Sequence, residues 1–122
     1  MKIAVTSKGN TLEAQVDPRF GRCQTFIIVE TEDMSFEAVD NSSTSAGGGA
    51  GIQAAQLIAD KNAEVLLTGN CGPNAFKTLE AAGIKTAVGV SGSIQEAVEQ
   101  YKSGKLTLTS APSVESHNGM SA

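Results

Sequence analysis

The chain has 122 residues and a mass of 12.5 kDa, a size that favours one compact domain around a single hydrophobic core. Nine basic and 13 acidic residues give a formal net charge of −4 at pH 7, which argues against nucleic acid or an anionic membrane as the main partner. The longest aliphatic or aromatic run, residues 26–29, is far shorter than the ~18 residues of a membrane helix. Because no apolar signal segment follows Met1, we expect a cytoplasmic protein.

The first third of the chain is predicted to be rich in strands. Alternating apolar residues indicate a strand over residues 2–7, and residues 26–29 are apolar on both faces, which is typical of an internal strand. Met34, Phe36 and Ala38 recur at every second position and indicate a third strand.

The rest of the chain alternates helices and strands. A glycine-rich run, residues 41–51, separates this part from the first three strands. Pro73 suits the first turn of a helix, Gly83 its end, and Ser93 with Glu96 fits a capping box. The expected elements are helices over residues 52–61, 73–83 and 93–104 and strands over residues 65–67 and 85–90.

This order predicts a single α/β domain with one mixed sheet of five strands flanked by three helices. The expected strand order is 3-2-1-4-5, with strand 2 antiparallel to its neighbours and strands 1, 4 and 5 parallel. Residues 1–106 form the predicted domain. Residues 107–122 are rich in Ser, Pro, Asn and Gly towards their end and are expected to form a flexible tail.

The predicted topology gathers the unusual residues at one edge of the sheet. Four loops lie at the carboxyl ends of the parallel strands, where α/β sheets bind ligands. They hold both cysteines, both arginines and most of the glycines, and they cover residues 7–22, 41–51, 69–72 and 91–93 together with Cys23 directly after the first. The opposite edge carries ordinary connectors, so we expect function at the loop edge.

The glycine-rich segment, residues 47–51, runs directly into a predicted helix. Backbone N–H groups and the positive end of the helix dipole favour an anion there, such as a phosphate or a sulfide-rich cluster. The segment lacks the Lys-Ser/Thr pair of a Walker loop and the spacing of a dinucleotide fingerprint. A flexible loop that precedes a helix is the alternative interpretation.

Cys23 and Cys71 are candidate metal ligands. Cys71 precedes the helix that Pro73 opens, and Cys23 follows Arg19 and Arg22, two settings that lower a thiol pKa. Their spacing of 48 positions, 71 − 23, fits neither a disulfide framework nor a CxxC metal knuckle. Both cysteines are alternatively small residues of the core.

The remaining candidate groups allow few other chemistries. Asp17 and Arg19 alternatively form a salt bridge within their loop. The single histidine, His117, lies in the polar tail with Met120, so it cannot supply a zinc site or a Ser/His/Asp triad inside the folded core, although it could act as a soft ligand over the loop edge.

Several spaced motifs resemble the dinitrogenase iron–molybdenum cofactor biosynthesis family, the small NifX-like accessory proteins. The matching positions cover the chain from its first strand to about residue 106, and they are residues 17–23 with Phe26, Asn41, residues 49–51, residues 69–75, Leu79 and residues 82–84. The resemblance implies a ribonuclease H-like fold. It also implies non-catalytic binding or carrying of a metal–sulfur cofactor or its precursor, either an iron–sulfur or a molybdenum-containing sulfide cluster, on its way to a cofactor-assembly or acceptor protein.

The predicted site combines the resemblance with the loop edge. We expect the cofactor to be bound by Arg19, Arg22, Gly48, Gly49, Gly51, Gly69, Asn70 and Gly72, with Cys23 and Cys71 as metal ligands. Two thiols cannot complete the four-cysteine shell of a usual [4Fe–4S] cluster. The cluster would therefore be held non-covalently, shared across a dimer, or completed by His117 or exogenous ligands.

The sequence argues against one other function and leaves a second one open. Nuclease activity is rejected because a two-metal nuclease needs clustered carboxylates and the first strand has none. A non-enzymatic regulatory or interaction protein, which binds a partner or small anion at the same edge with structural cysteines, is the alternative function.

Overall fold

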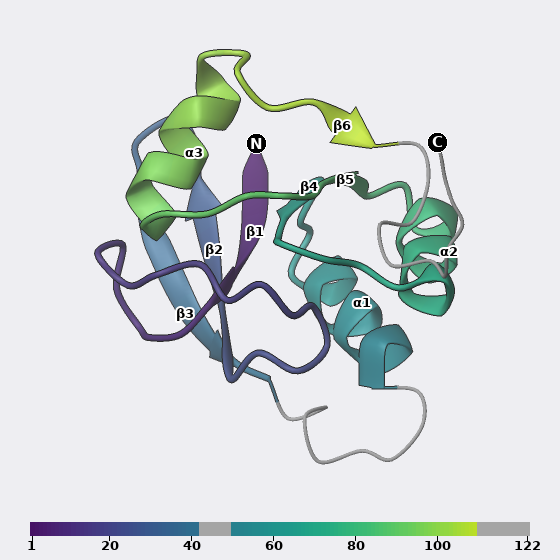
Figure 1. Ribbon diagram of the computed structural model, residues 1–122. Coiled ribbons are helices and arrows are strands. Elements are labelled where there is room, and N and C mark those ends of the chain that lie inside the picture. Colours follow the sequence, from purple (N-terminus) through teal and green to yellow (C-terminus); the bar gives the residue numbers. More distant parts are fainter. Residues whose placement is uncertain (42–49, 110–122) are drawn as a thin grey trace.

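The structure, a computed structural model, describes residues 1–41 and 50–109 (Figure 1). Six strands and three helices follow one another within these residues. In chain order they are β1 (Lys2–Ser7), β2 (Thr25–Glu30), β3 (Phe36–Asp40), α1 (Ala50–Asp60), β4 (Val65–Leu67), α2 (Pro73–Ala81), β5 (Lys85–Ala87), α3 (Ile94–Lys102) and β6 (Leu108–Thr109).

The strands form one mixed sheet in the order β3-β2-β1-β4-β5-β6. β1, β4 and β5 are parallel, whereas β2 is antiparallel to both β1 and β3. The expected order 3-2-1-4-5 is therefore confirmed, and β2 is internal as its two apolar faces predicted. The assignment to a ribonuclease H-like fold stays a prediction.

The expected number of five strands is wrong, because β6 adds a sixth. β6 pairs antiparallel with β5, with Leu108 opposite Ala87 and Thr109 opposite Thr86. It lies within the segment expected to be a flexible tail, residues 107–122, of which residues 110–122 are outside the described residues. A strand of two residues carries no measurable alternation, so only its pairing with the edge of the sheet reveals it.

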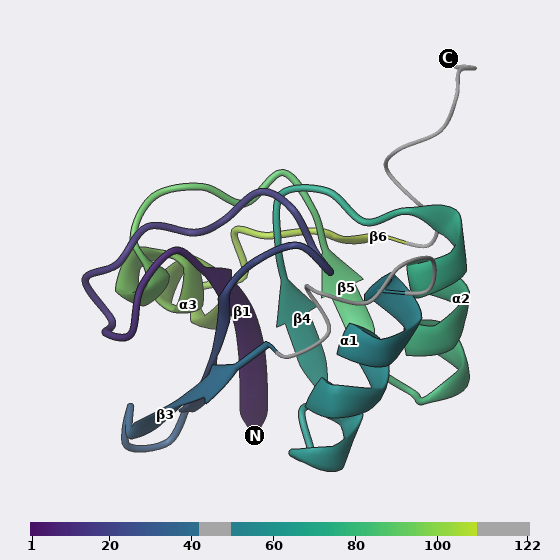
Figure 2. The same ribbon diagram turned by 90° about the horizontal axis from the view of Figure 1, so that it is seen from below.

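The sheet separates two hydrophobic clusters. Ala4, Phe26 and Leu66 point to the face that α1 and α2 cover. Their neighbours in sequence, Ile3 and Val5 among them, point to the face that α3 covers. Figure 2 shows α1 and α2 together on one side of the sheet and α3 on the other. Strand alternation thus divides the core into two layers, as the period of two requires.

Local signals explain the boundaries of several elements. Pro73 is in the first turn of α2, and Ser93 and Glu96 form the predicted capping box at the start of α3. β5 ends at Ala87 rather than at the expected residue 90, because Gly89 has a φ of +73° that a strand does not tolerate. Within the described part of the chain, no helix has the length and apolar character needed to cross a membrane.

Candidate functional site

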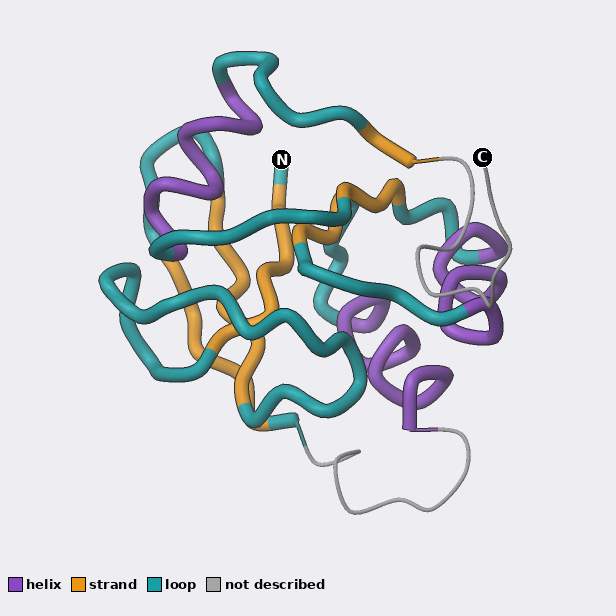
Figure 3. Tube along the Cα trace, viewed as in Figure 1, coloured by secondary structure: helices purple, strands orange, loops and turns teal. Residues whose placement is uncertain are grey.

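The loops at the carboxyl ends of β1, β4 and β5 lie side by side. Figure 2 shows the segments around residues 10–24, 68–72 and 88–93 on one side of the strand ends. Residues 8–24 form one long loop across this edge (Figure 3). Its first half is held by backbone hydrogen bonds to the start of α3, such as Ile94 N to Ala14 O at 2.9 Å. The predicted gathering of loops at one edge is therefore confirmed for the described residues.

The second half of the long loop is joined to the turn after β4. Asn70 N donates to Pro18 O at 2.7 Å, and Phe20 N donates to Asn70 O at 3.3 Å. A Cβ atom added to Gly69 would lie only 2.6 Å from Pro18 Cα and 2.9 Å from Pro18 O. Glycine at position 69 is therefore required by a close backbone approach, and this approach places Arg19 beside Asn70.

Asp17 organises this loop from inside the protein. Its side chain is 4% exposed and accepts hydrogen bonds from Arg19 N at 2.9 Å, Nε at 3.2 Å and Nη2 at 3.3 Å. This contact raises the pKa of Arg19. The loop salt bridge that the sequence offered as an alternative for Asp17 and Arg19 is thus present, and it uses much of the guanidinium's hydrogen-bonding capacity.

Two buried threonines support the same loop from the strand ends. Thr6 Oγ1 donates to Asp17 O at 2.6 Å and lies 2.9 Å from Thr68 Oγ1. Both threonines are fully buried. Sequence reasoning missed them, although a hydroxyl at the end of an otherwise apolar strand is a usable signal because it must find a buried partner.

Arg22 is exposed, and its backbone N–H donates to Arg19 O at 3.3 Å. Arg22 forms no ion pair within residues 1–41 and 50–109. Of the two predicted arginines, Arg19 pairs with Asp17, whereas the guanidinium of Arg22 has no carboxylate partner among the described residues.

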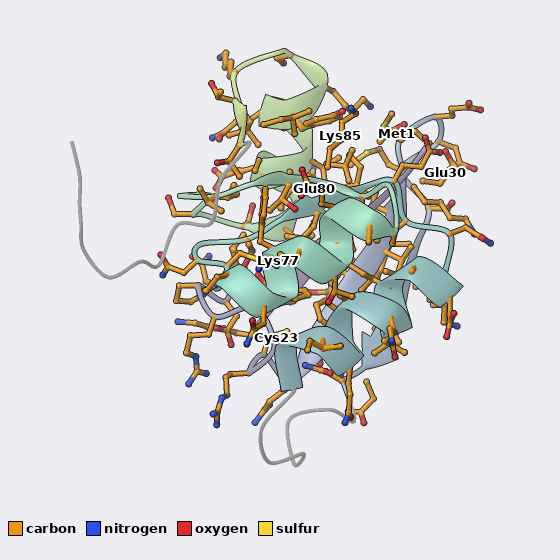
Figure 4. All side chains as sticks on the ribbon, turned by 90° about the vertical axis from the view of Figure 1, so that its right-hand side faces the viewer. Met1, Cys23, Glu30, Lys77, Glu80 and Lys85 are labelled. Carbon is orange, nitrogen blue, oxygen red and sulfur yellow. The ribbon has the colours of Figure 1, made fainter. Side chains whose placement is uncertain are left out.

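Cys23 is fully buried in the cluster beneath α1 and α2, near Phe20 and Phe26. Figure 4 labels it on the side of the sheet that these helices cover. Asn41 Nδ2 donates to Cys23 O at 2.8 Å and lies 3.7 Å from its Sγ. In the sequence Asn41 is only one position of the family motif, whereas in the structure it joins the end of β3 to the arginine–cysteine loop, residues 17–23.

Both thiols have a pKa opposite in direction to the expected one. Burial raises the pKa of Cys23 to about 12 and that of Cys71 to about 11. The arginines do not lower the first, because Arg19 is turned to Asp17 and is exposed, while Cys71 lies in the apolar cluster with Ala75 and Phe76. Neither cysteine forms a disulfide, and both are protonated at neutral pH when no metal is bound.

The first turns of α1 and α2 are side by side. A Cβ atom added to Gly51 would lie 2.9 Å from Ala75 Cβ, so glycine allows the two helices to approach closely. Gly72 is the N-cap of α2 and makes no side-chain cap, and neither helix has an acidic residue in its first turn. Two helix N-termini therefore direct their positive ends to the loop edge. Gly48 and Gly49 lie outside the described residues.

The predicted residues thus come together unequally. The structure brings Arg19, Gly69 and Asn70 into contact and places Cys23 and Cys71 in one buried cluster. Among the described residues, no group of three or more His, Cys, Asp and Glu side chains is arranged to hold a metal ion. His117 and Met120 are outside the described residues. The loop edge is suited to an anion, and Cys23 and Cys71 are the two thiols near it that a metal could use as ligands.

Known proteins resemble this chain in both sequence and fold. Residues 1–104 match the family model described as dinitrogenase iron-molybdenum cofactor. The apo form of the orange protein from Desulfovibrio gigas is 43% identical, with a TM-score of 0.91 over 93% of this chain and 96% of that one. An NMR structure of a Thermotoga protein proposed to be a NifB protein is 36% identical, with a TM-score of 0.81 over 93% and 97%.

A curated relative, the uncharacterized protein MJ0580 of Methanocaldococcus jannaschii, is 33% identical over 87% of this chain and 89% of its own length. The family match covers every described residue that forms the loop edge. The chain belongs to the dinitrogenase iron–molybdenum cofactor family.

Proposed function

We propose that the protein binds and carries a metal–sulfur cofactor or its precursor at the loop edge and passes it to an assembly or acceptor protein without catalysing a reaction. One observation carries the proposal. The contact of Pro18 and Arg19 with Gly69 and Asn70 joins the arginine–cysteine loop to the turn that opens α2. At this junction Arg19 lies beside Asn70, and Cys71 follows Asn70 in the sequence.

The electrostatics of the edge favour an anionic sulfide cluster as cargo. Arg22 offers an exposed guanidinium, whereas Arg19 is partly neutralised by Asp17. The first turns of α1 and α2 add N–H groups and two aligned helix dipoles. Local groups thereby attract an anion although the whole chain carries a net charge of −4.

The thiols contribute only after they lose their protons. Because the pKa values of Cys23 and Cys71 are raised to about 12 and about 11, a metal must displace a proton from each to gain a thiolate ligand. Two cysteines are also too few for a usual [4Fe–4S] site. We therefore assign the main binding to ionic contacts and hydrogen bonds, with Cys23 and Cys71 as the two available protein ligands.

The family to which the chain belongs supports the proposal, because its model is described as dinitrogenase iron-molybdenum cofactor. The similar Desulfovibrio gigas protein is described as an orange protein in its apo form. Cysteines outside a disulfide are compatible with the reducing cytoplasm, where we propose that the protein acts.

Anaerobic reconstitution tests the proposal. Full-length protein is incubated with iron and sulfide, with and without molybdate, then desalted and examined by visible spectroscopy and metal quantification per chain. Retained charge-transfer absorbance with stoichiometric metal supports a carrier and identifies the metal. A colourless and metal-free protein with intact circular dichroism contradicts it and favours the alternative, a regulatory or interaction protein that binds a partner or small anion here.

Two sets of variants separate the contributions. Arg22→Gln is expected to lower the amount of retained metal, because it removes an exposed cation of the site, whereas the matched control Lys102→Gln on α3 retains it. Cys23→Ser and Cys71→Ser are tested singly and together, with thermal unfolding to confirm that each variant folds. Unchanged metal in the folded double variant eliminates the thiol ligands but leaves the ionic site in place.

A further inference from the structure

A cavity lies away from the loop edge, between the carboxyl end of α2 and the strands β5 and β6. Its volume is about 370 Å³, within the range of ~300–1,000 Å³ typical of small-molecule sites. Phe76, Ile84 and Leu108 form its apolar walls. Because Lys85 begins β5, this cavity is at the opposite end of that strand from the candidate cofactor site.

The wall of this cavity contains a polar group that the described protein atoms do not satisfy. Thr86 lines the cavity and is 1% exposed. Its Oγ1 is the buried side-chain oxygen of the described residues without a hydrogen-bond partner. Buried hydroxyls are nearly always hydrogen-bonded, so that of Thr86 still has a hydrogen bond to offer to a molecule bound beside it.

Two opposite charges also face the cavity without joining each other. Glu80 on α2 and Lys85 on β5 both line it, and both side chains are exposed. Neither forms an ion pair in the described part of the chain. Glu80 is in the last turn of α2, where the helix dipole is negative and favours a cation.

We propose that this cavity binds a small zwitterion with a compact apolar body, which is the chemistry of a free aliphatic amino acid. Its ammonium group is placed between Glu80 and the carboxyl end of α2. Its carboxylate accepts the hydrogen bond that Thr86 leaves unused and is attracted by the exposed ammonium group of Lys85. The apolar body contacts Phe76, Ile84 and Leu108. This site is independent of the proposed cofactor cargo.

The test is an NMR titration of full-length, ¹⁵N-labelled protein with L-leucine. Two analogues each lack one charge, namely 3-methylbutylamine and 4-methylpentanoate. We expect saturable shifts at the amides of residues 83–86 and 108–109 with L-leucine, and weaker binding of both analogues because each leaves one charge of the cavity unpaired. Shifts that fail to appear, or equal binding of the three compounds, overturn the proposal.

A matched pair of variants tests the hydroxyl. Thr86→Val keeps the shape of the side chain and removes the orphaned group, and we expect it to fold and to bind L-leucine about fivefold to tenfold more weakly. Thr107→Val is the control, because Thr107 is exposed and does not line the cavity. Unchanged affinity in Thr86→Val contradicts the role of Thr86. Nuclear Overhauser contacts from residues 110–122 into the cavity of the ligand-free protein also overturn the proposal, because they assign the cavity to the chain itself.

Discussion

The two faces of the sheet are packed in different ways. The face under α3 is built mainly from branched aliphatic side chains, including Ile3, Val5 and Leu67. The face under α1 and α2 combines alanines with aromatic rings and holds both Cys23 and Cys71. The small residues let the two helices approach each other and bring their first turns to the loop edge. We infer that the α3 face mainly stabilises the fold, whereas the α1–α2 face also shapes the site.

The largest expected effect is on the α3 face. Leu67→Ala removes a fully buried side chain and should lower the free energy of unfolding by about 2–5 kcal/mol, because it leaves a cavity. Urea unfolding measures this loss. Metal retained per folded chain should equal that of the natural sequence, and a loss of metal from the folded variant would show that the two faces are not separable in function.

Gly69→Ala is expected to affect both stability and cargo. The added methyl group would lie 2.6 Å from Pro18 Cα, so the loop must move away, at a cost of about 1–3 kcal/mol. Thermal unfolding and metal retention measure the two effects. Gly104→Ala is the control, because Gly104 follows the carboxyl end of α3, away from the loop edge, and has a positive φ but no atom within 4 Å of an added Cβ. Equal metal retention in the two folded variants would refute the role of the Gly69 contact.

Ser93→Ala tests the α3 face at its helix start. Ser93 Oγ accepts a hydrogen bond from Glu96 N at 3.1 Å, and losing this cap should cost about 1 kcal/mol. Chemical denaturation gives the cost, and we expect cargo binding to remain. A change of less than a few tenths of a kcal/mol would mean that solvent replaces the cap.

A pH dependence is also expected from the thiols of the α1–α2 face. Their folded-state pKa values, about 12 for Cys23 and about 11 for Cys71, are above the ordinary value of 9.0. Their stabilising contribution is therefore complete below pH 9 and decreases as the pH rises from 9 towards 11 and 12, because the unfolded chain loses these protons first. Stability curves at pH 8, 9 and 10 should fall less steeply for the Cys23→Ser, Cys71→Ser variant. Parallel curves would contradict the raised pKa values.

The sequence alone predicted the order of the first five strands, because alternating and helical spacings are local consequences of burial on one or two faces. It also indicated which loops meet, since parallel strands end at the same edge. It did not predict β6, whose two residues become a strand only by pairing with β5. The end of β5 was also missed, because the positive φ at Gly89 is fixed by the turn and not by hydrophobic spacing.

The chemistry of the site depended more on tertiary structure. Position along the chain suggested activated thiols near two arginines and a helix start. Burial instead raises both pKa values, and the carboxylate of Asp17 holds Arg19, because desolvation and ion pairing depend on three-dimensional neighbours. The sequence thus determined which residues meet at the loop edge, whereas only the folded structure decided how strongly each one is charged, buried and available to a ligand.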